Sequence, residues 1–255
     1  MADPITLIAL RDIPEVRRGA DLAQLLARAL SAAAVTLRSD DVLVVAQKIV
    51  SKAEGRLVAL SAVEPGARAL ELARVTGKDA RLVELILGES SAVVRAAQDV
   101  LIVRHRLGFV MANAGIDRSN LAAGPAAGEV LLLPVDPDGS AAALRAALAA
   151  RAGAAPGVII SDSFGRPWRR GVVNIALGAA GVPALLDRRG EADRAGRRLE
   201  VTEIALGDAL AAAAGLVMGE AAEGIPAVLI RGCTLKAGAL PAQSLIRPQD
   251  QDLFC

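Results

Sequence analysis

The chain has 255 residues, with 29 basic and 28 acidic side chains, a net charge of +1 and 2% aromatic residues. This balance argues against a general nucleic-acid-binding surface, which needs a basic excess. Two cysteines, Cys233 and Cys255, offer neither a disulfide framework nor a metal-binding spacing. The N-terminal residues lack the features of a signal peptide, and the apolar run Ala209–Met218 is about half as long as a bilayer-spanning helix. We therefore expect a soluble, cytoplasmic protein that makes no membrane contact.

The first part of the chain predicts a mixture of strands and helices. Continuous apolar runs predict strands, and apolar residues at helical spacing predict helices, the first of them behind the cap Asp21. Arg104–Leu107 reads as a polar hairpin turn, which makes the sole histidine, His105, a surface residue. The expected strands are Thr6–Leu10, Val42–Val45, Val100–Val103, Gly108–Met111 and Val130–Leu133, and the expected helices are Asp21–Leu30, Glu64–Thr76, Asp79–Leu87 and Ala141–Ala152.

The later part of the chain contains the least ordinary stretch, Gly157–Asn174. A short strand, Val158–Ile160, is expected to end at Ser161-Asp162-Ser163, with a Gly-Arg-Pro turn after it and a helix after Gly171. Further expected elements are a polar insertion at Asp187–Arg198, strands at Val201–Ile204 and Pro226–Ile230, a helix at Gly207–Met218, and a partly ordered tail at Arg247–Cys255.

The order of these elements does not repeat as strand–helix–strand units. It therefore favours a mixed α+β fold with largely antiparallel sheets over a doubly wound parallel sheet. We expect one domain over residues 1–255, with division into two subdomains left open.

Familiar nucleotide-binding motifs are absent from the sequence. Neither G-x-x-x-x-G-K-[ST] nor G-x-G-x-x-G occurs, which argues against a P-loop or Rossmann site. The single histidine likewise argues against a zinc site or a serine–histidine triad.

Three acids in predicted loops or at strand ends are candidate ligands for a hard divalent cation. They are Asp117, Asp162 and Glu220, and the hydroxyl of Ser163 can add a fourth oxygen. Mg²⁺ and Mn²⁺ prefer such oxygen ligands, together with water and substrate phosphates. Taken singly, each acid also fits a helix cap or a solvated loop charge, so spacing alone leaves both interpretations open.

Basic residues near these acids suit a phosphorylated ligand. Arg166, Arg169 and Arg170 follow Asp162, and two lysines follow a buried strand. Positive groups beside a metal neutralise charge in phosphoryl transfer. The arginines can equally pair with acids of the Asp187–Arg198 insertion.

Five segments, in order, resemble the coenzyme F420-0:gamma-glutamyl ligase family. The resemblance runs from about Asp12 to Gly232, nearly the whole chain. The five segments are VLVVAQKIVSKAEGR (Val42–Arg56), NAGIDRSN (Asn113–Asn120), LLPVDPDGSA (Leu132–Ala141), GVIISDSFGRPWRRG (Gly157–Gly171) and GLVMGEAAEGIPAVLIRG (Gly215–Gly232).

The resemblance implies an amide ligase that uses GTP to activate a carboxylate of coenzyme F420-0. L-glutamate then reacts with the activated acid, and a further γ-linked glutamate follows. It also implies two Mg²⁺ or Mn²⁺ ions, K⁺ as an additional candidate ion, an intertwined homodimer, and a fold unrelated to P-loop, Rossmann or ATP-grasp enzymes.

The resemblance also assigns roles to residues. Asp117 and Asp162 match the metal-binding, catalytic aspartates, and Ser163 and Glu220 match positions that bind a second metal. Arg166, Arg169 and Arg170 are candidates for substrate binding. The positions that match nucleotide-contacting segments are Asp12, Ile13, Pro14, Glu15, Gln47, Lys48, Lys52, Asn120, Met218, Gly219, Glu220, Ala221, Ala222, Glu223, Gly224 and Ile225.

Two departures from the family pattern affect the nucleotide site. Gln47-Lys48 replaces a pair that is usually small and hydroxylated, and Asp12 replaces a frequent glycine. Both departures touch the nucleotide pocket, so the preference for GTP over another triphosphate stays open, and Gln47-Lys48 also leaves open a related ligase for another phosphorylated carboxylic acid. A non-catalytic nucleotide-binding or F420-binding homologue is a further alternative, against which the retained Asp117, Asp162 and Glu220 argue. We expect Trp168 to pack beneath the arginine turn, and no fused nitroreductase domain.

Overall fold

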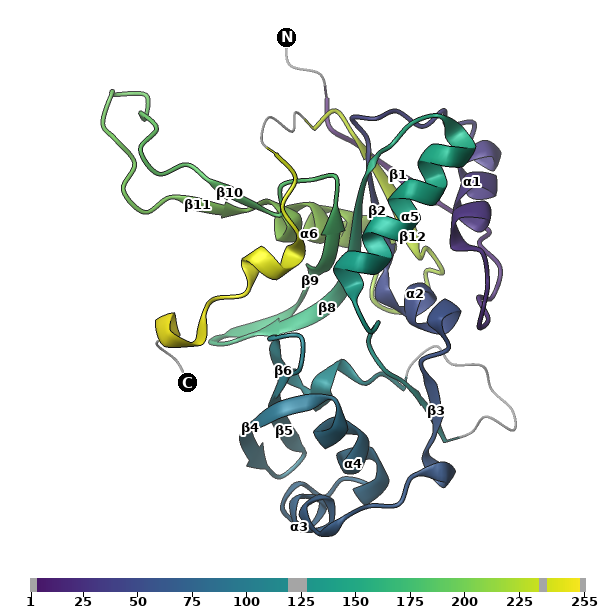
Figure 1. Cartoon of the computed structure of the whole chain (residues 1–255), viewed down its shortest axis with the longest axis vertical. Coiled ribbons are helices and arrows are strands. Elements are labelled where there is room, and N and C mark those ends of the chain that lie inside the picture. Colours follow the sequence, from purple (N-terminus) through teal and green to yellow (C-terminus); the bar gives the residue numbers. More distant parts are fainter. Residues whose placement is uncertain (1–3, 119–127, 234–237, 253–255) are drawn as a thin grey trace. The chain divides into compact units, whose positions relative to one another are not determined.

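The computed structural model describes residues 4–118, 128–233 and 238–252 (Figure 1). The chain forms two compact units, one from Met1–Ala53 and Pro134–Leu245, the other from Glu54–Leu133 and Ile246–Cys255. Within the described residues, no helix has the length and apolar character that crossing a bilayer requires.

A five-stranded sheet forms the centre of the first unit. Its order is β1-β12-β2-β8-β9, and β2–β8 is its one parallel pair. The side chains of Val42–Val45 in β2 are fully buried, as expected for a strand covered on both faces. The strands are β1 (Thr6–Leu10), β2 (Val42–Ala46), β8 (Gly157–Arg166), β9 (Arg169–Ala180) and β12 (Ala227–Arg231).

Helices cover both faces of this sheet. The helices α1 (Leu22–Ala32), α2 (Gln47–Glu54) and α5 (Pro137–Ala152) share one hydrophobic core with Leu43, Val45 and Ile160. The helix α6 (Leu206–Met218) packs on the other face, against Val44 and Ile159. Alternating side chains along β2 and β8 therefore supply two separate cores.

The lateral edge of the sheet, at the buried half of β9, is covered by two aspartates. Asp208 accepts a hydrogen bond from the Ala176 amide (2.9 Å), and Asp138 accepts one from the Ala179 amide (2.7 Å). Burial raises the pKa of Asp208, against the effect of its bond to Ala176. These contacts occupy donors that would otherwise pair with another strand. The unit also contains β10 (Leu185–Asp187), β11 (Glu203–Ala205) and the short helix η3 (Ala242–Leu245).

The second unit has its own core beneath a three-stranded antiparallel sheet, β4-β5-β6. A separate pair, β3–β7, is also antiparallel. The elements are β3 (Leu57–Ala59), η1 (Leu60–Ala62), α3 (Ala67–Thr76), α4 (Ala80–Gly88), β4 (Ser90–Ala97), β5 (Val100–His105), β6 (Val110–Ala112), η2 (Asn113–Gly115), β7 (Glu129–Leu131) and η4 (Gln249–Gln251).

The prediction of a mixed α+β fold with largely antiparallel sheets is confirmed. The prediction for Gly157–Asn174 was wrong in two respects: β8 continues through Asp162 to Arg166, and the segment after Gly171 is strand β9, not a helix. Strand β4 was not predicted. His105 ends β5 and is fully buried, so its assignment to the surface was also wrong.

Candidate functional site

Four segments of the first unit converge on one edge of the five-stranded sheet. Leu10 of β1 pairs with Ala227 of β12, Ala227 pairs with Val45 of β2, and Val45 pairs with Ile160 of β8. The end of β1, the end of β2, the start of β12 and the continuation of β8 therefore meet along one row. Of the segments predicted from the resemblance, Asp12–Glu15 follow β1, Gln47 and Lys48 follow β2, Met218–Ile225 precede β12, and Asp162-Ser163 continue β8 beyond this row.

The segment after β1 begins at an unusual backbone conformation. Asp12 has φ 59°, in the left-handed region that glycine adopts most readily and that aspartate adopts more often than most other residues. This geometry suits the glycine that the resemblance implies at this position. Three residues later, the carboxylate of Glu15 accepts a hydrogen bond from Nζ of Lys52 (2.6 Å).

Helix α2 follows β2 without a loop and brings Lys52 to the same edge. Lys52 is 7% exposed, whereas the side chain of Glu15 is 60% exposed. The largely buried ammonium of Lys52 is therefore bound by the solvent-exposed carboxylate of Glu15. Because a flexible exposed carboxylate can move aside, an anionic ligand can compete with Glu15 for Lys52.

Gln47, the first residue of α2, has an unsatisfied donor. Its side chain is buried, and its Oε1 accepts a hydrogen bond from Oγ of Ser51 (2.8 Å). Nε2 has no hydrogen-bond partner among the described residues. A buried donor without a partner costs about 1–3 kcal/mol. Gln47 is one of the two departures from the pattern that the resemblance implies. Its amide is held by the hydrogen bond from Ser51, and its Nε2 donor lies at the start of α2, next to Lys48 in the sequence.

Asp162 and Ser163 lie on opposite faces of β8. Ile160 faces the core shared with α5, and side chains alternate along a strand, so Asp162 faces the α5 side of the sheet. Ser163 faces the other side, opposite Asn174, whose side chain packs against Gly215 of α6. In a regular strand one ion cannot contact both side chains, so Asp162 and Ser163 suit different ions.

The loop Met218–Ile225 depends on glycine at its first turn. Gly219, the residue after α6, has φ 71° and ψ 178°, a conformation essentially restricted to glycine. A Cβ at this position would also overlap the side chain of Glu223, which accepts a hydrogen bond from the Ala221 amide (2.8 Å). The loop leaves Glu220 exposed at the sheet edge.

The three candidate substrate arginines lie farther along the same hairpin. Arg166 pairs with Arg169 next to the turn between β8 and β9, and the intervening Trp168 is 91% exposed. The prediction that Trp168 packs beneath the turn was wrong. A two-residue turn at the end of a two-stranded ribbon provides no core for an indole to enter.

Asp117 belongs to the second unit and has a rigid backbone. It follows three residues with positive φ, Asn113 (52°), Ala114 (53°) and Gly115 (67°), and exchanges two backbone hydrogen bonds of 2.9 Å with Leu131. Such strain commonly persists where a side chain must be placed accurately. Asn120, another predicted nucleotide contact, lies outside the described residues.

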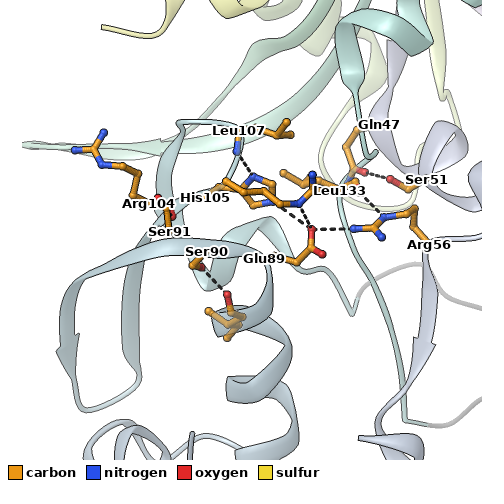
Figure 2. A network of polar contacts seen from close by, with 12 residues as sticks. Gln47, Ser51, Arg56, Glu89, Ser90, Ser91, Arg104, His105, Leu107 and Leu133 are labelled. Atoms are coloured by element: carbon orange, nitrogen blue, oxygen red, sulfur yellow. Dashed lines mark hydrogen bonds and ion pairs between the residues drawn. The ribbon is translucent and has the colours of Figure 1, made fainter. Parts of the chain in front are cut away.

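The second unit also contains a charged cluster that the sequence did not predict (Figure 2). Oε2 of Glu89 accepts hydrogen bonds from Nη2 of Arg56 (2.8 Å) and Nε of Arg106 (3.1 Å). Nε2 of His105 lies 3.5 Å from the same oxygen. Arg56 also donates to the carbonyl of Leu133 (2.8 Å). Because Arg56 is near the start of this unit's main segment and Leu133 at its end, the cluster joins both ends.

Glu89 is predicted to make stability depend on pH. Partial burial acts to raise its pKa, but the nearby imidazole of His105, the hydrogen bond from Arg56, and the charges of Arg56 and Arg106 lower it from 4.5 to about 2. Its ionised form therefore stabilises the fold fully above pH 4.5, and this contribution is lost as the pH falls toward 2.

The replacement Glu89→Gln tests this dependence by urea unfolding at a series of pH values. We expect the variant to be less stable than the wild type at pH 6, with the difference shrinking steadily below pH 4.5. A difference that is the same at pH 6 and pH 3 would contradict the assignment.

The predicted metal ligands divide between the two units. Asp162, Ser163 and Glu220 lie in the first unit, and Asp117 lies in the second. Their donors are all oxygens, which fit a hard divalent cation. Among residues 4–118, 128–233 and 238–252, no three histidine, cysteine, aspartate or glutamate side chains form a group that could hold a metal ion.

Comparison with known proteins identifies relatives over nearly the full length. The F420-0:gamma-glutamyl ligase family profile matches residues 11–232. A coenzyme F420:L-glutamate ligase of Methanothermobacter thermautotrophicus is 46% identical, with 98% of each chain covered. Those of Methanopyrus kandleri (49%, covering 94% of this chain and 93% of the relative) and Archaeoglobus fulgidus (41%, covering 98% and 96%) are similar. The chain therefore belongs to the F420-0:gamma-glutamyl ligase family.

Proposed function

We propose that this protein joins L-glutamate to coenzyme F420-0 in a GTP-dependent reaction and then adds a further γ-linked glutamate. The observation that carries the proposal is the single row of paired residues Leu10, Ala227, Val45 and Ile160. It brings together the ends of β1 and β2, the start of β12 and the middle of β8, and with them the predicted nucleotide and metal positions of the first unit. We also propose that the enzyme acts as a cytoplasmic homodimer.

In the proposed reaction, a carboxylate oxygen of F420-0 bonds to the γ-phosphorus of GTP. The bond from that phosphorus to the bridging oxygen breaks, and GDP leaves. The glutamate nitrogen then bonds to the carbonyl carbon of the acyl phosphate, phosphate leaves with the electrons of the broken carbon–oxygen bond, and the amine loses a proton. We assign no general base, because positioning of the amine beside an activated carbonyl can supply much of the rate.

The chain's own residues would bind and orient the reactants. Lys52 would exchange Glu15 for a nucleotide phosphate, and the amide of Gln47 would donate to an acceptor on the nucleotide. Two Mg²⁺ or Mn²⁺ ions, proposed to be held by Asp117, Asp162, Ser163 and Glu220, would supply neutralisation of phosphate charge when bound. K⁺ is a further proposed ion, for which we assign no ligands.

An acyl phosphate can be trapped with hydroxylamine in the absence of glutamate. We expect a hydroxamate of F420-0 and GDP, formed only when F420-0, GTP and a divalent cation are all present. Glutamate ligation in the complete reaction, together with no hydroxamate when hydroxylamine replaces glutamate, would contradict the acyl-phosphate route. Replacing GTP with ATP in parallel tests the nucleotide preference that Gln47 leaves open.

Lys52→Met is expected to raise the KM for GTP by about 10- to 100-fold, because a hydrogen bond to a charged group contributes about 1.5–3 kcal/mol. Steady-state kinetics with GTP as the varied substrate measures this. Lys78→Met, which removes a lysine of the second unit, is the matched control and should leave the KM unchanged. Equal effects of the two replacements would argue against a nucleotide contact at Lys52.

A further inference from the structure

The turn between β8 and β9 combines an exposed aromatic ring with an unfavourable backbone conformation. Trp168 has φ 64°, which is rare for a bulky side chain, and it is 91% exposed. Folding gains little from this residue, because the ring is not buried and its backbone conformation costs free energy. A ligand that covers the ring would provide a reason for its presence.

Positively charged side chains flank this ring in the sequence on both sides. Arg166 and Arg169 are paired directly across the ribbon, an arrangement in which like charges repel. Nη2 of Arg166 donates to the carbonyl of Arg170 (3.1 Å), and its Nε has no hydrogen-bond partner in the described part of the chain. Arginine guanidinium groups bind phosphate and carboxylate with well-defined geometry. The turn thus offers a flat apolar surface bordered by groups that bind anions.

We infer that Arg166–Arg170 forms the binding surface for the aromatic ring and the phosphate of the acceptor, coenzyme F420-0. Trp168 stacks on the ring, and the arginines contact the phosphate that links the ring to the reactive carboxylate. This inference rests on the proposed ligase function. It adds a role for Trp168 and gives the three arginines one ligand.

The placement along the sheet favours the acceptor over the nucleotide. The proposed nucleotide segments follow β1 and β2 and precede β12, whereas the turn lies at the end of β8 and β9. From Ser161, at the sheet edge, to Arg166 there are five residues of strand, about 17 Å. An elongated acceptor can therefore lie along the ribbon, with its carboxylate near Asp162 and its ring at Trp168.

The only tryptophan of the chain provides a direct probe, since indole fluorescence reports on Trp168 alone. Titration of the wild-type protein with F420-0, without GTP, is expected to quench this fluorescence saturably. GTP alone should not. Trp168→Ala should raise the KM for F420-0 about tenfold, consistent with stacking energies for aromatic bases, and leave the KM for GTP unchanged. Trp168→Phe should retain most of the affinity.

Val201→Ala is the matched control, because Val201 is also exposed (85%) and apolar but lies away from this turn. The inference is overturned if Trp168→Ala leaves the KM for F420-0 unchanged, or if GTP alone produces the quenching. It is also overturned if Trp168→Ala changes only the oligomeric state, which would make the turn a contact between copies. Saturable quenching by F420-0 without any turnover would support the inference and reject the proposed function.

Discussion

Asp162→Asn is expected to reduce ligase turnover by about 10²- to 10³-fold, comparable with the loss of one group that stabilises developing charge in other enzymes. Asparagine keeps the size and one oxygen of the side chain but removes the negative charge that a divalent cation requires. Asp162 is in strand β8, two residues beyond Ile160 in the row formed with Leu10, Ala227 and Val45. The variant should therefore keep its fold and lose catalysis.

Asp40→Asn is the control for this experiment. Asp40 is an exposed aspartate before β2, at the opposite end of that strand from the candidate site. We expect it to keep wild-type turnover, measured as GDP release with saturating substrates. Normal turnover of Asp162→Asn at saturating Mn²⁺ would refute the metal assignment, and restored turnover only at high Mn²⁺ would support it.

Arg231→Met is expected to destabilise the protein by about 3–5 kcal/mol, because it leaves a buried carboxylate without its cation. Both oxygens of Asp41 accept hydrogen bonds of 2.7 Å from the guanidinium of Arg231, and Asp41 is completely buried. Hydrogen bonding and charge from Asp41 raise the pKa of Arg231. Urea unfolding at pH 7 measures the loss.

The double replacement Asp41→Leu with Arg231→Met separates loss of the pair from exposure of an unpaired charge. It should be more stable than Arg231→Met alone, since apolar replacement of both partners removes the unpaired charge. If the double variant is less stable than Arg231→Met, the unpaired charge is not the cause of the loss in Arg231→Met. That loss then arises from packing or from the hydrogen bond that Arg231 donates to the Thr36 carbonyl (2.7 Å).

Local sequence signals predicted the elements whose stability is largely local or whose burial is uniform. The apolar run Val42–Val45 is a central strand, and Asp21 caps α1 through the Gln24 amide (2.9 Å). The prediction failed where pairing between distant segments decides the structure. The segment after Gly171 was predicted to be a helix, yet Arg169–Ala180 forms a strand because β8 supplies its partner.

The candidate site was predictable as a set of residues but not as an arrangement. The segments around Asp12, Gln47, Asp162 and Gly219 were identified by resemblance, whereas their meeting at one edge follows from strand order and register. The pair Glu15–Lys52 joins residues 37 positions apart, and no spacing rule indicates it.

Sequence patterns did not indicate two further features of the structure. Arg56 and Glu89, 33 positions apart, meet only because the second unit brings the end of α4 beside the start of β3. The exposure of Trp168 depends on the exact length of the β8–β9 hairpin, which composition does not reveal.

The most direct test of the proposed function is a complete reaction followed by mass spectrometry. The purified protein is incubated with F420-0, L-glutamate, GTP and Mn²⁺, with omission of each component as a control. The account predicts F420-0 products heavier by one and then two glutamate residues, with one GDP released for each addition. Binding of GTP and Mn²⁺ without any glutamate addition would contradict it, as would ligation of glutamate to another acid while F420-0 remains unchanged.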